Sequence, residues 1–183
     1  MKKFEEKTIK TTPIYDGRMI KLQIDDVTLP NGQMAKREII KHPGAVAIIA
    51  VTDEGKLVLV EQYRKALERS IIEIPAGKLE PGEEPVVTAY RELEEETGYG
   101  ARSLMFLQAF ATSPGFADEV IYLFVAKGLY KIDQKADLDE DEFVELLEVS
   151  LEDAQQMIVE QRIYDAKTAF AVLWLAANLQ HNL

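Results

Sequence analysis

The stretch GKLEPGEEPVVTAYRELEEETGYG, Gly77 to Gly100, contains seven glutamates and a single arginine. Four of these glutamates fall within five residues near its end. Proline suits the first position of a helix, and glycine suits the position just after a helix. The placement of Pro85 and Gly98 therefore predicts a helix over Pro85 to Thr97 that carries most of this charge.

The predicted helix has one acidic face and one apolar face. Glu92, Glu95 and Glu96 lie together on the acidic face, next to an apolar face that includes Ala89 and Leu93. Like charges three or four residues apart destabilise a helix by roughly 0.2–0.5 kcal/mol per pair. A divalent cation reverses the sign of this interaction, and carboxylate oxygens are the ligands that Mg²⁺ prefers. The acidic face is thus a candidate metal site, although a solvated surface is the ordinary reading of such a run.

The remaining sequence predicts strands before this helix and strands and helices after it. Arg18 to Leu29 and Gln33 to His42 flank a Pro-Asn-Gly turn, which is typical of a β-hairpin. A second hairpin is expected from AVAIIAVT and KLVLVEQY, and its first strand is apolar on both faces, which favours a central position. The later elements are expected as strands over LMFLQAFAT, EVIYLFVAK and Phe143 to Val149, and helices over Leu151 to Val159 and Asp165 to Leu179. This order predicts an α+β fold.

Composition narrows the possible functions. The net charge is −11, which opposes non-specific attraction to nucleic acid or to anionic membranes. The chain has no cysteine and only two histidines, so disulfides and thiolate or His-rich metal sites are excluded, and any metal should be bound by oxygen. The start, MKKFEEKTIK, lacks the apolar core of a signal peptide, and we therefore expect a cytoplasmic protein.

The spacing of the acidic stretch resembles the signature of the Nudix hydrolases, which cleave nucleoside diphosphates linked to another group. Five residues separate Gly77 from Glu83, seven separate Glu83 from Arg91, and RELEEETGY follows. Tyr99 is the one departure, because the family usually has an aliphatic residue there. The resemblance implies an α/β/α sandwich in which this stretch forms a loop, a helix and a loop.

The resemblance also implies roles for individual residues. Glu92 and Glu96 would be ligands of Mg²⁺ or Mn²⁺, and Glu95 would be a ligand or a close neighbour of the ligands. The carbonyl oxygen of Ala76 would be a further ligand. Arg91 would orient the acids and, with Glu95, would assist catalysis.

Features outside this stretch resemble the ADP-ribose pyrophosphatase subgroup. Pro114, in SPG, lies sixteen positions after Gly98, and EQYR and EIPAGKLEPGE occur upstream. The subgroup also implies that residues 1–42 form a small antiparallel β segment that pairs two chains into a homodimer, with residues 43–183 as the hydrolase domain. The implied reaction converts ADP-ribose and water to AMP and ribose 5-phosphate. The implied substrate-binding residues are Arg64, Arg37, Pro114 and Glu73.

In the same subgroup the catalytic base comes from a late loop, which DEDEFVE, Asp139 to Glu145, resembles. The resemblance implies Glu140 as the base and Glu142 as an additional metal ligand, although the two roles could be exchanged. Adenine is expected to stack on an aromatic residue of the N-terminal segment, and Phe4 and Tyr15 are the candidates.

Three other functions compete with this one. The same chemistry could act on a GDP-sugar or on NADH, which a panel of substrates would separate. A Nudix-like protein could also bind ADP-ribose without cleaving it, although the intact glutamate set argues against such a sensor. The acids of DLDEDEFVELLE have the spacing of an EF-hand calcium loop, but Glu142 stands where that loop needs glycine.

Overall fold

The computed structural model describes residues 3–133 and 143–178, and the chain divides into two compact units. The first unit comprises the residues up to Gly44 together with Phe110–Ile121, and the second comprises Ala45–Ala109 together with Tyr122–Leu183. The separate N-terminal segment expected from the sequence lies within the first unit. Its role in dimerisation remains a prediction.

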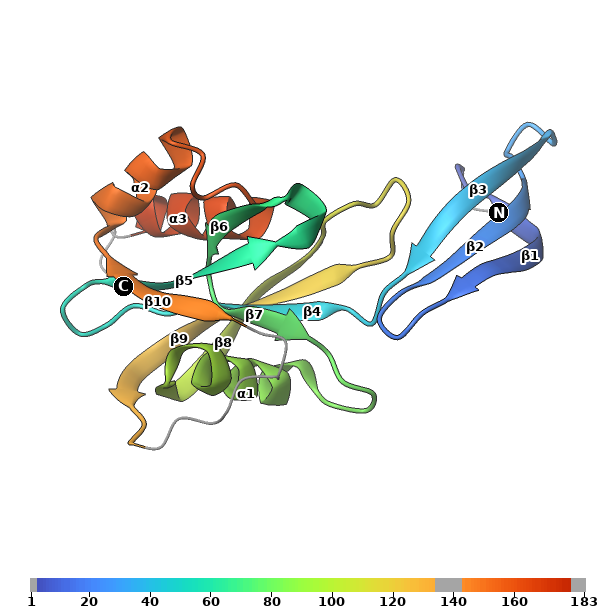
Figure 1. Ribbon diagram of the computed structural model, residues 1–183. Helices are drawn as coiled ribbons and strands as arrows, with labels where there is room; N and C mark the ends of the chain where they lie inside the picture. Colours follow the sequence, from blue (N-terminus) through green and yellow to red (C-terminus); the bar gives the residue numbers. More distant parts are fainter. Residues whose placement is uncertain (1–2, 134–142, 179–183) are drawn as a thin grey trace. The chain divides into compact units, whose positions relative to one another are not determined.

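The first unit is built on a three-stranded antiparallel sheet with the order β1-β2-β3 (Figure 1). Its strands are β1 (Lys7–Asp16), β2 (Lys21–Thr28) and β3 (Met34–Lys41). The expected hairpin forms β2 and β3, and Gly32 adopts the positive φ of 84° that its turn requires. The backbone amide of Ile40 donates to the carbonyl of Phe116 at 2.8 Å, which ties the loop 112–119 to β3.

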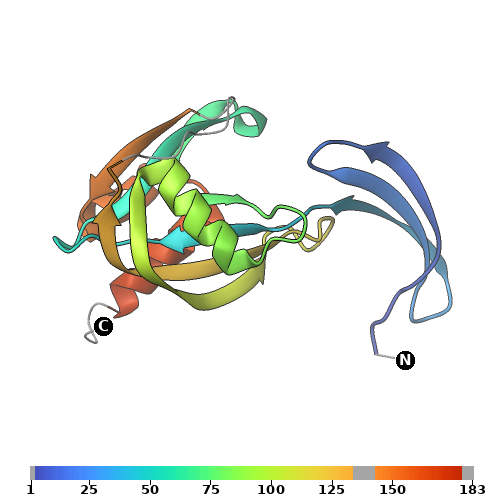
Figure 2. The same ribbon diagram turned by 90° about the horizontal axis from the view of Figure 1, so that it is seen from below.

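The second unit contains two sheets (Figures 1 and 2). A four-stranded sheet has the order β7-β4-β9-β8, and a three-stranded sheet has the order β10-β5-β6. Their bounds are β4 (Ala45–Ile49), β5 (Leu57–Arg64), β6 (Arg69–Glu73), β7 (Ala76–Lys78), β8 (Tyr99–Ala111), β9 (Val120–Lys131) and β10 (Val144–Val149). The 3-10 turn Lys65–Leu67 connects β5 to β6. β4 is an interior strand, as its apolar sequence predicted.

The hairpin expected between β4 and β5 forms only at its turn. The amide of Val58 donates to the carbonyl of Ala50 at 2.9 Å, but the two strands then enter different sheets. β4 is almost entirely buried and so is the first half of β5, Leu57 to Val60, and each sheet therefore receives one apolar segment from this turn.

In the described part of the second unit, three α-helices cover the sheets. They are α1 (Pro85–Thr97), α2 (Leu151–Val159) and α3 (Ala166–Asn178). α1 lies on one side of the sheets, and α2 and α3 lie on the other, which gives the predicted α/β/α order (Figure 1). The bounds of α1 match the prediction, with Pro85 at its start and Gly98 in the left-handed conformation at its end. Among the described residues, no helix is long and apolar enough to span a membrane.

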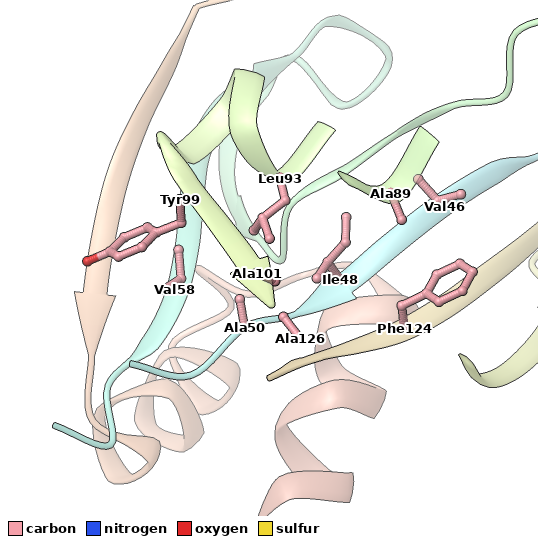
Figure 3. Close-up of a cluster of buried hydrophobic side chains, with 10 residues drawn as sticks. All are labelled: Val46, Ile48, Ala50, Val58, Ala89, Leu93, Tyr99, Ala101, Phe124 and Ala126. Atoms are coloured by element: carbon pink, nitrogen blue, oxygen red, sulfur yellow. The ribbon is translucent and has the colours of Figure 1, made fainter. Parts of the chain in front are cut away.

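The apolar face of α1 packs on β4 in a buried cluster (Figure 3). The cluster consists of Val46, Ile48, Ala50, Val58, Ala89, Leu93, Tyr99, Ala101, Phe124 and Ala126. Its one polar member, Tyr99, buries its ring and points its hydroxyl toward β10, where it donates to Glu148 at 2.6 Å. This bond explains why tyrosine is accommodated at a position where the family usually has an aliphatic residue.

The Tyr99 hydroxyl makes a testable contribution to stability. Burial and the bond to Glu148 raise its pKa from 10.0 to about 12, so the folded state holds this proton more tightly than the unfolded state does. The resulting stabilisation is complete below pH 10 and is lost as the pH rises toward 12. Tyr99→Phe should lower the free energy of unfolding by about 1 kcal/mol at pH 7, and the difference should shrink at high pH. Urea denaturation at several pH values measures the free energy of unfolding of both proteins. A difference between them that stays constant up to pH 12 would show that the Tyr99 hydroxyl does not make this contribution.

Candidate active site on helix α1

The acidic face of α1 is organised around the guanidinium of Arg91. Its Nη1 donates to Oε1 of Glu92 and to Oε2 of Glu95, each at 2.8 Å, and its Nη2 donates to Oε2 of Glu83 at 3.2 Å. Glu92 and Glu96 are almost fully buried, because their side of the helix adjoins the apolar face that packs on β4. The predicted orienting role of Arg91 is consistent with this geometry.

The electrostatics of this face follow from the same contacts. Burial by itself lowers the pKa of Arg91, but the bonds and ion pairs with Glu83, Glu92 and Glu95 outweigh it and leave the pKa raised. The hydrogen bond from Arg91, followed by the bond from Thr88 at 2.7 Å, lowers the pKa of Glu83. One guanidinium thus bonds three carboxylates, and Glu96 is held by a different part of the chain.

The start of β7 brings backbone against the acidic face. The amide of Ala76 donates to Oε2 of Glu96 at 2.9 Å. A Cβ atom at Gly77 would lie 1.9 Å from the carboxyl carbon of Glu92, so a larger residue there would displace this carboxylate. The structure therefore places the amide of Ala76 beside a predicted metal ligand, and the role of the Ala76 carbonyl remains a prediction.

Arg64 and Glu73 form an ion pair in the second unit. Nε of Arg64 donates to Oε2 of Glu73 at 2.6 Å, and the carboxylate of Glu73 is buried. Burial lowers the pKa of Arg64, but Glu73 and the charges of Glu96 and Asp165 raise it by more.

Lys167, the second residue of α3, also bonds Glu73. It was not among the predicted site residues, because a lysine in the first turn of a helix gives no sign in the sequence that it is buried and paired. The sequence alone does not identify the partner, because Glu73 lies 94 positions away along the chain.

The other predicted site residues lie in the first unit or outside the described residues. Arg37 belongs to the first unit, where its Nη2 donates to Oε1 of Glu6 at 2.6 Å, and Pro114 lies in the loop of the same unit. Phe4 and Tyr15 are exposed in that unit. Glu140 and Glu142 lie outside the described residues. The roles assigned to all of these residues remain predictions.

The acidic face fits a hard divalent cation by the chemistry of its donors. Glu92, Glu95 and Glu96 supply carboxylate oxygens, and the backbone of Ala76 lies beside them. Within residues 3–133 and 143–178, no three acidic or histidine side chains are already arranged around a common point for an ion. Arg91 bonds two of the carboxylates, and we therefore expect metal binding to displace Arg91 from Glu92.

Replacing Glu96 by glutamine tests this arrangement without relying on an activity. The amide oxygen of glutamine can still accept the bond from Ala76, while the loss of one charge relieves repulsion on the face. We expect the metal-free variant to be as stable as the wild type or up to about 0.5 kcal/mol more stable. Mg²⁺ should raise the melting temperature of the wild type and leave that of Glu96→Gln unchanged.

Glu94→Gln, on the same helix, is the matched control and should keep the response to Mg²⁺. An equal rise in melting temperature for Glu96→Gln and the wild type would show that Glu96 is not a ligand.

Comparisons with known proteins identify the family of the chain. The family model of the NUDIX domain matches residues 41–169. The methanol dehydrogenase activator of Bacillus methanolicus is 66% identical over 95% of this chain and 94% of its own, and the ADP-ribose pyrophosphatase of Bacillus subtilis (strain 168) is 59% identical over 96% and 95%. The crystal structure of an ADP compounds hydrolase shares the fold, with a TM-score of 0.82 and 23% identity over 98% of this chain and 97% of that one. The chain therefore belongs to the NUDIX family.

Proposed function

We propose that this protein hydrolyses the diphosphate of ADP-ribose to AMP and ribose 5-phosphate with the help of Mg²⁺. The observation that carries the proposal is the crowding of Glu92, Glu95 and Glu96 on one face of α1, with Arg91 bonding two of them. The name of the relative that is 59% identical over nearly the whole chain supports the choice of substrate. A polyanionic substrate also needs cations at its site, because the protein itself carries a net charge of −11.

Each part of the site has a task in this reaction. Glu92, Glu95 and Glu96, with the carbonyl of Ala76, would hold Mg²⁺ or Mn²⁺. The bound metal would polarise the phosphorus atom and lower the pKa of the attacking water. Arg64 would bind diphosphate oxygens with the fork of its guanidinium. Pro114, Glu73 and Arg37 would complete the substrate site.

The acidic segment Asp139 to Glu145 would supply the catalytic base and an additional metal ligand. Glu140 would accept the proton of the attacking water, because glutamates committed to a metal are poor bases. Glu142 would be a further metal ligand. Glu140→Gln should then lower kcat strongly with little change in Mg²⁺ dependence, whereas Glu142→Gln should raise the Mg²⁺ concentration needed for half-maximal rate. If Glu140→Gln instead raises the Mg²⁺ requirement and Glu142→Gln lowers kcat, then Glu142 is the base and Glu140 is the metal ligand.

Product analysis tests the proposed reaction. The purified protein, incubated with ADP-ribose and Mg²⁺, should release AMP and ribose 5-phosphate in equal amounts, and EDTA should stop the reaction. GDP-mannose and NADH, tested under the same conditions, should be cleaved with a lower kcat/KM. A higher kcat/KM for either of them would reject ADP-ribose as the preferred substrate, and binding without product would indicate a sensor.

We also propose a second function, the activation of a methanol dehydrogenase. The support for it is the name of the relative that is 66% identical, a methanol dehydrogenase activator. The two functions are compatible if activation depends on the same carboxylates. Adding the wild type or Glu96→Gln to a methanol dehydrogenase, and measuring the rate of that enzyme, would show whether activation depends on the carboxylates of α1. Activation by the wild type alone would place both functions at one site.

We also propose that the protein is a homodimer formed through the first unit. Strand β1 exposes Ile9, Ile14 and Tyr15, and Met34 of β3 is exposed as well. A small sheet with this much exposed apolar surface is expected to pack on another chain. Light scattering at micromolar concentration should give twice the chain mass of 20.7 kDa, and a fully active monomer would contradict this proposal.

A further inference from the structure

Four charged side chains meet at the start of α3, and we call them the α3 cluster: Arg64, Glu73, Asp165 and Lys167. The ammonium of Lys167 donates to Oε1 of Glu73 and, at 3.0 Å, to Oδ1 of Asp165. The other oxygen of Glu73, Oε2, accepts from Nε of Arg64 at 2.6 Å. The two oxygens of Glu73 therefore have different partners, one from α3 and one from β5.

Burial makes these contacts interdependent. The side chains of Glu73 and Lys167 are only 3% and 9% exposed, and buried charges are strongly unfavourable unless they are paired. The cluster contains two cations and two anions. Removing Lys167 alone would leave Glu73 with Arg64 as its single cationic partner and Asp165 without its ammonium donor.

Arg64 is the member of the cluster that reaches the surface, because its side chain is 41% exposed. Among the described residues, the hydrogen-bond partner of Arg64 is Glu73, which accepts from Nε. The orientation of the guanidinium is therefore set by one oxygen of Glu73, and Lys167 bonds the other oxygen of the same carboxylate.

We propose that Lys167 is a positioning residue for the diphosphate site: it fixes the carboxylate of Glu73, which in turn holds Arg64 with its terminal nitrogens directed to the substrate. The inference rests on the proposed role of Arg64. It adds a residue on α3, which no part of the family signature contains, to the determinants of substrate affinity.

A purely structural role for Lys167 explains less. α3 is already attached to the same segment, because the amide of Ile74 donates to Oγ1 of the fully buried Thr168 at 3.0 Å. Asp165 caps α3 through the amide of Thr168 at 3.1 Å, and this bond does not require a lysine. The feature specific to Lys167 is its charge on the oxygen of Glu73 that Arg64 does not use.

The test uses Lys167→Met and the double variant Lys167→Met/Asp165→Asn. The double variant keeps the cluster electrically balanced, so it remains informative if the single variant fails to fold. Lys65→Met is the matched control, because it removes an exposed lysine paired with Glu68 at 2.5 Å in the nearby β5–β6 connection. Circular dichroism should show native structure for the double variant and the control.

Two measurements decide the proposal. Solvent exchange of the Arg64 Nε proton, followed by ¹⁵N NMR and assigned by its absence in Arg64→Lys, should be at least about tenfold faster in the double variant than in the control. KM for ADP-ribose should rise about tenfold with kcat changed by less than about threefold. In an Arg64→Ala background the same two substitutions should have no further effect on KM, because Lys167 acts through Arg64.

Unchanged exchange of the Arg64 proton would overturn the inference. An equal rise in KM with and without Arg64 would also overturn it, because the effect would then be independent of the guanidinium. A wild type that does not hydrolyse ADP-ribose would instead refute the proposed function, and proton exchange alone would then decide whether Lys167 positions Arg64.

Discussion

The repulsion among carboxylates on one face of α1 is the constraint on which the site depends. A helix tolerates Glu92, Glu95 and Glu96 beside a buried apolar face only if cations or donors hold their oxygens. Arg91 bonds the first two and Glu83 as well, and the amide of Ala76 bonds the third. The helix is thereby preorganised with its negative charge in one place. A metal ion that replaces Arg91 at Glu92 would relieve the remaining repulsion.

The segment from Glu73 to Gly77 connects this face to the opposite side of the fold. On the α3 side, Lys167 bonds Glu73 and Thr168 bonds the amide of Ile74. On the α1 side, the amide of Ala76 bonds Glu96, and Gly77 allows the close approach of Glu92. The proposed diphosphate clamp and the proposed metal site therefore share one short stretch of backbone. A substitution in α1 or in α3 that moves this stretch should therefore alter both the proposed metal site and the proposed diphosphate clamp.

The parts of the fold with local signals could be predicted from the sequence. Helix α1 has proline, an apolar face and a terminal glycine, and its bounds agree with the prediction. β4 was expected to be interior because it is apolar on both faces, and it is. Strand β1 was missed because its few apolar residues do not alternate with polar ones and nearly all of its side chains are exposed, so its pairing with β2 leaves no pattern in the sequence.

The site was predictable where its residues are close in sequence and not where they are distant. The acidic face of α1 could be predicted because helical periodicity brings its glutamates together. The contact of Lys167 with Glu73 depends on packing between elements 94 positions apart, which no local pattern encodes. Strands β6 and β7 are short, and their role of carrying Glu73 and Ala76 to the two helices becomes visible only in three dimensions.

The proposed function requires that the carboxylates of α1 bind a divalent cation. A crystal soaked in Mn²⁺, with diffraction measured at an energy where manganese scatters anomalously, tests this binding. We expect an anomalous peak between the carboxylates of Glu92 and Glu96 and the carbonyl of Ala76, with Arg91 displaced from Glu92. A fully soaked crystal without a peak there, in which Arg91 still bonds Glu92, would contradict it.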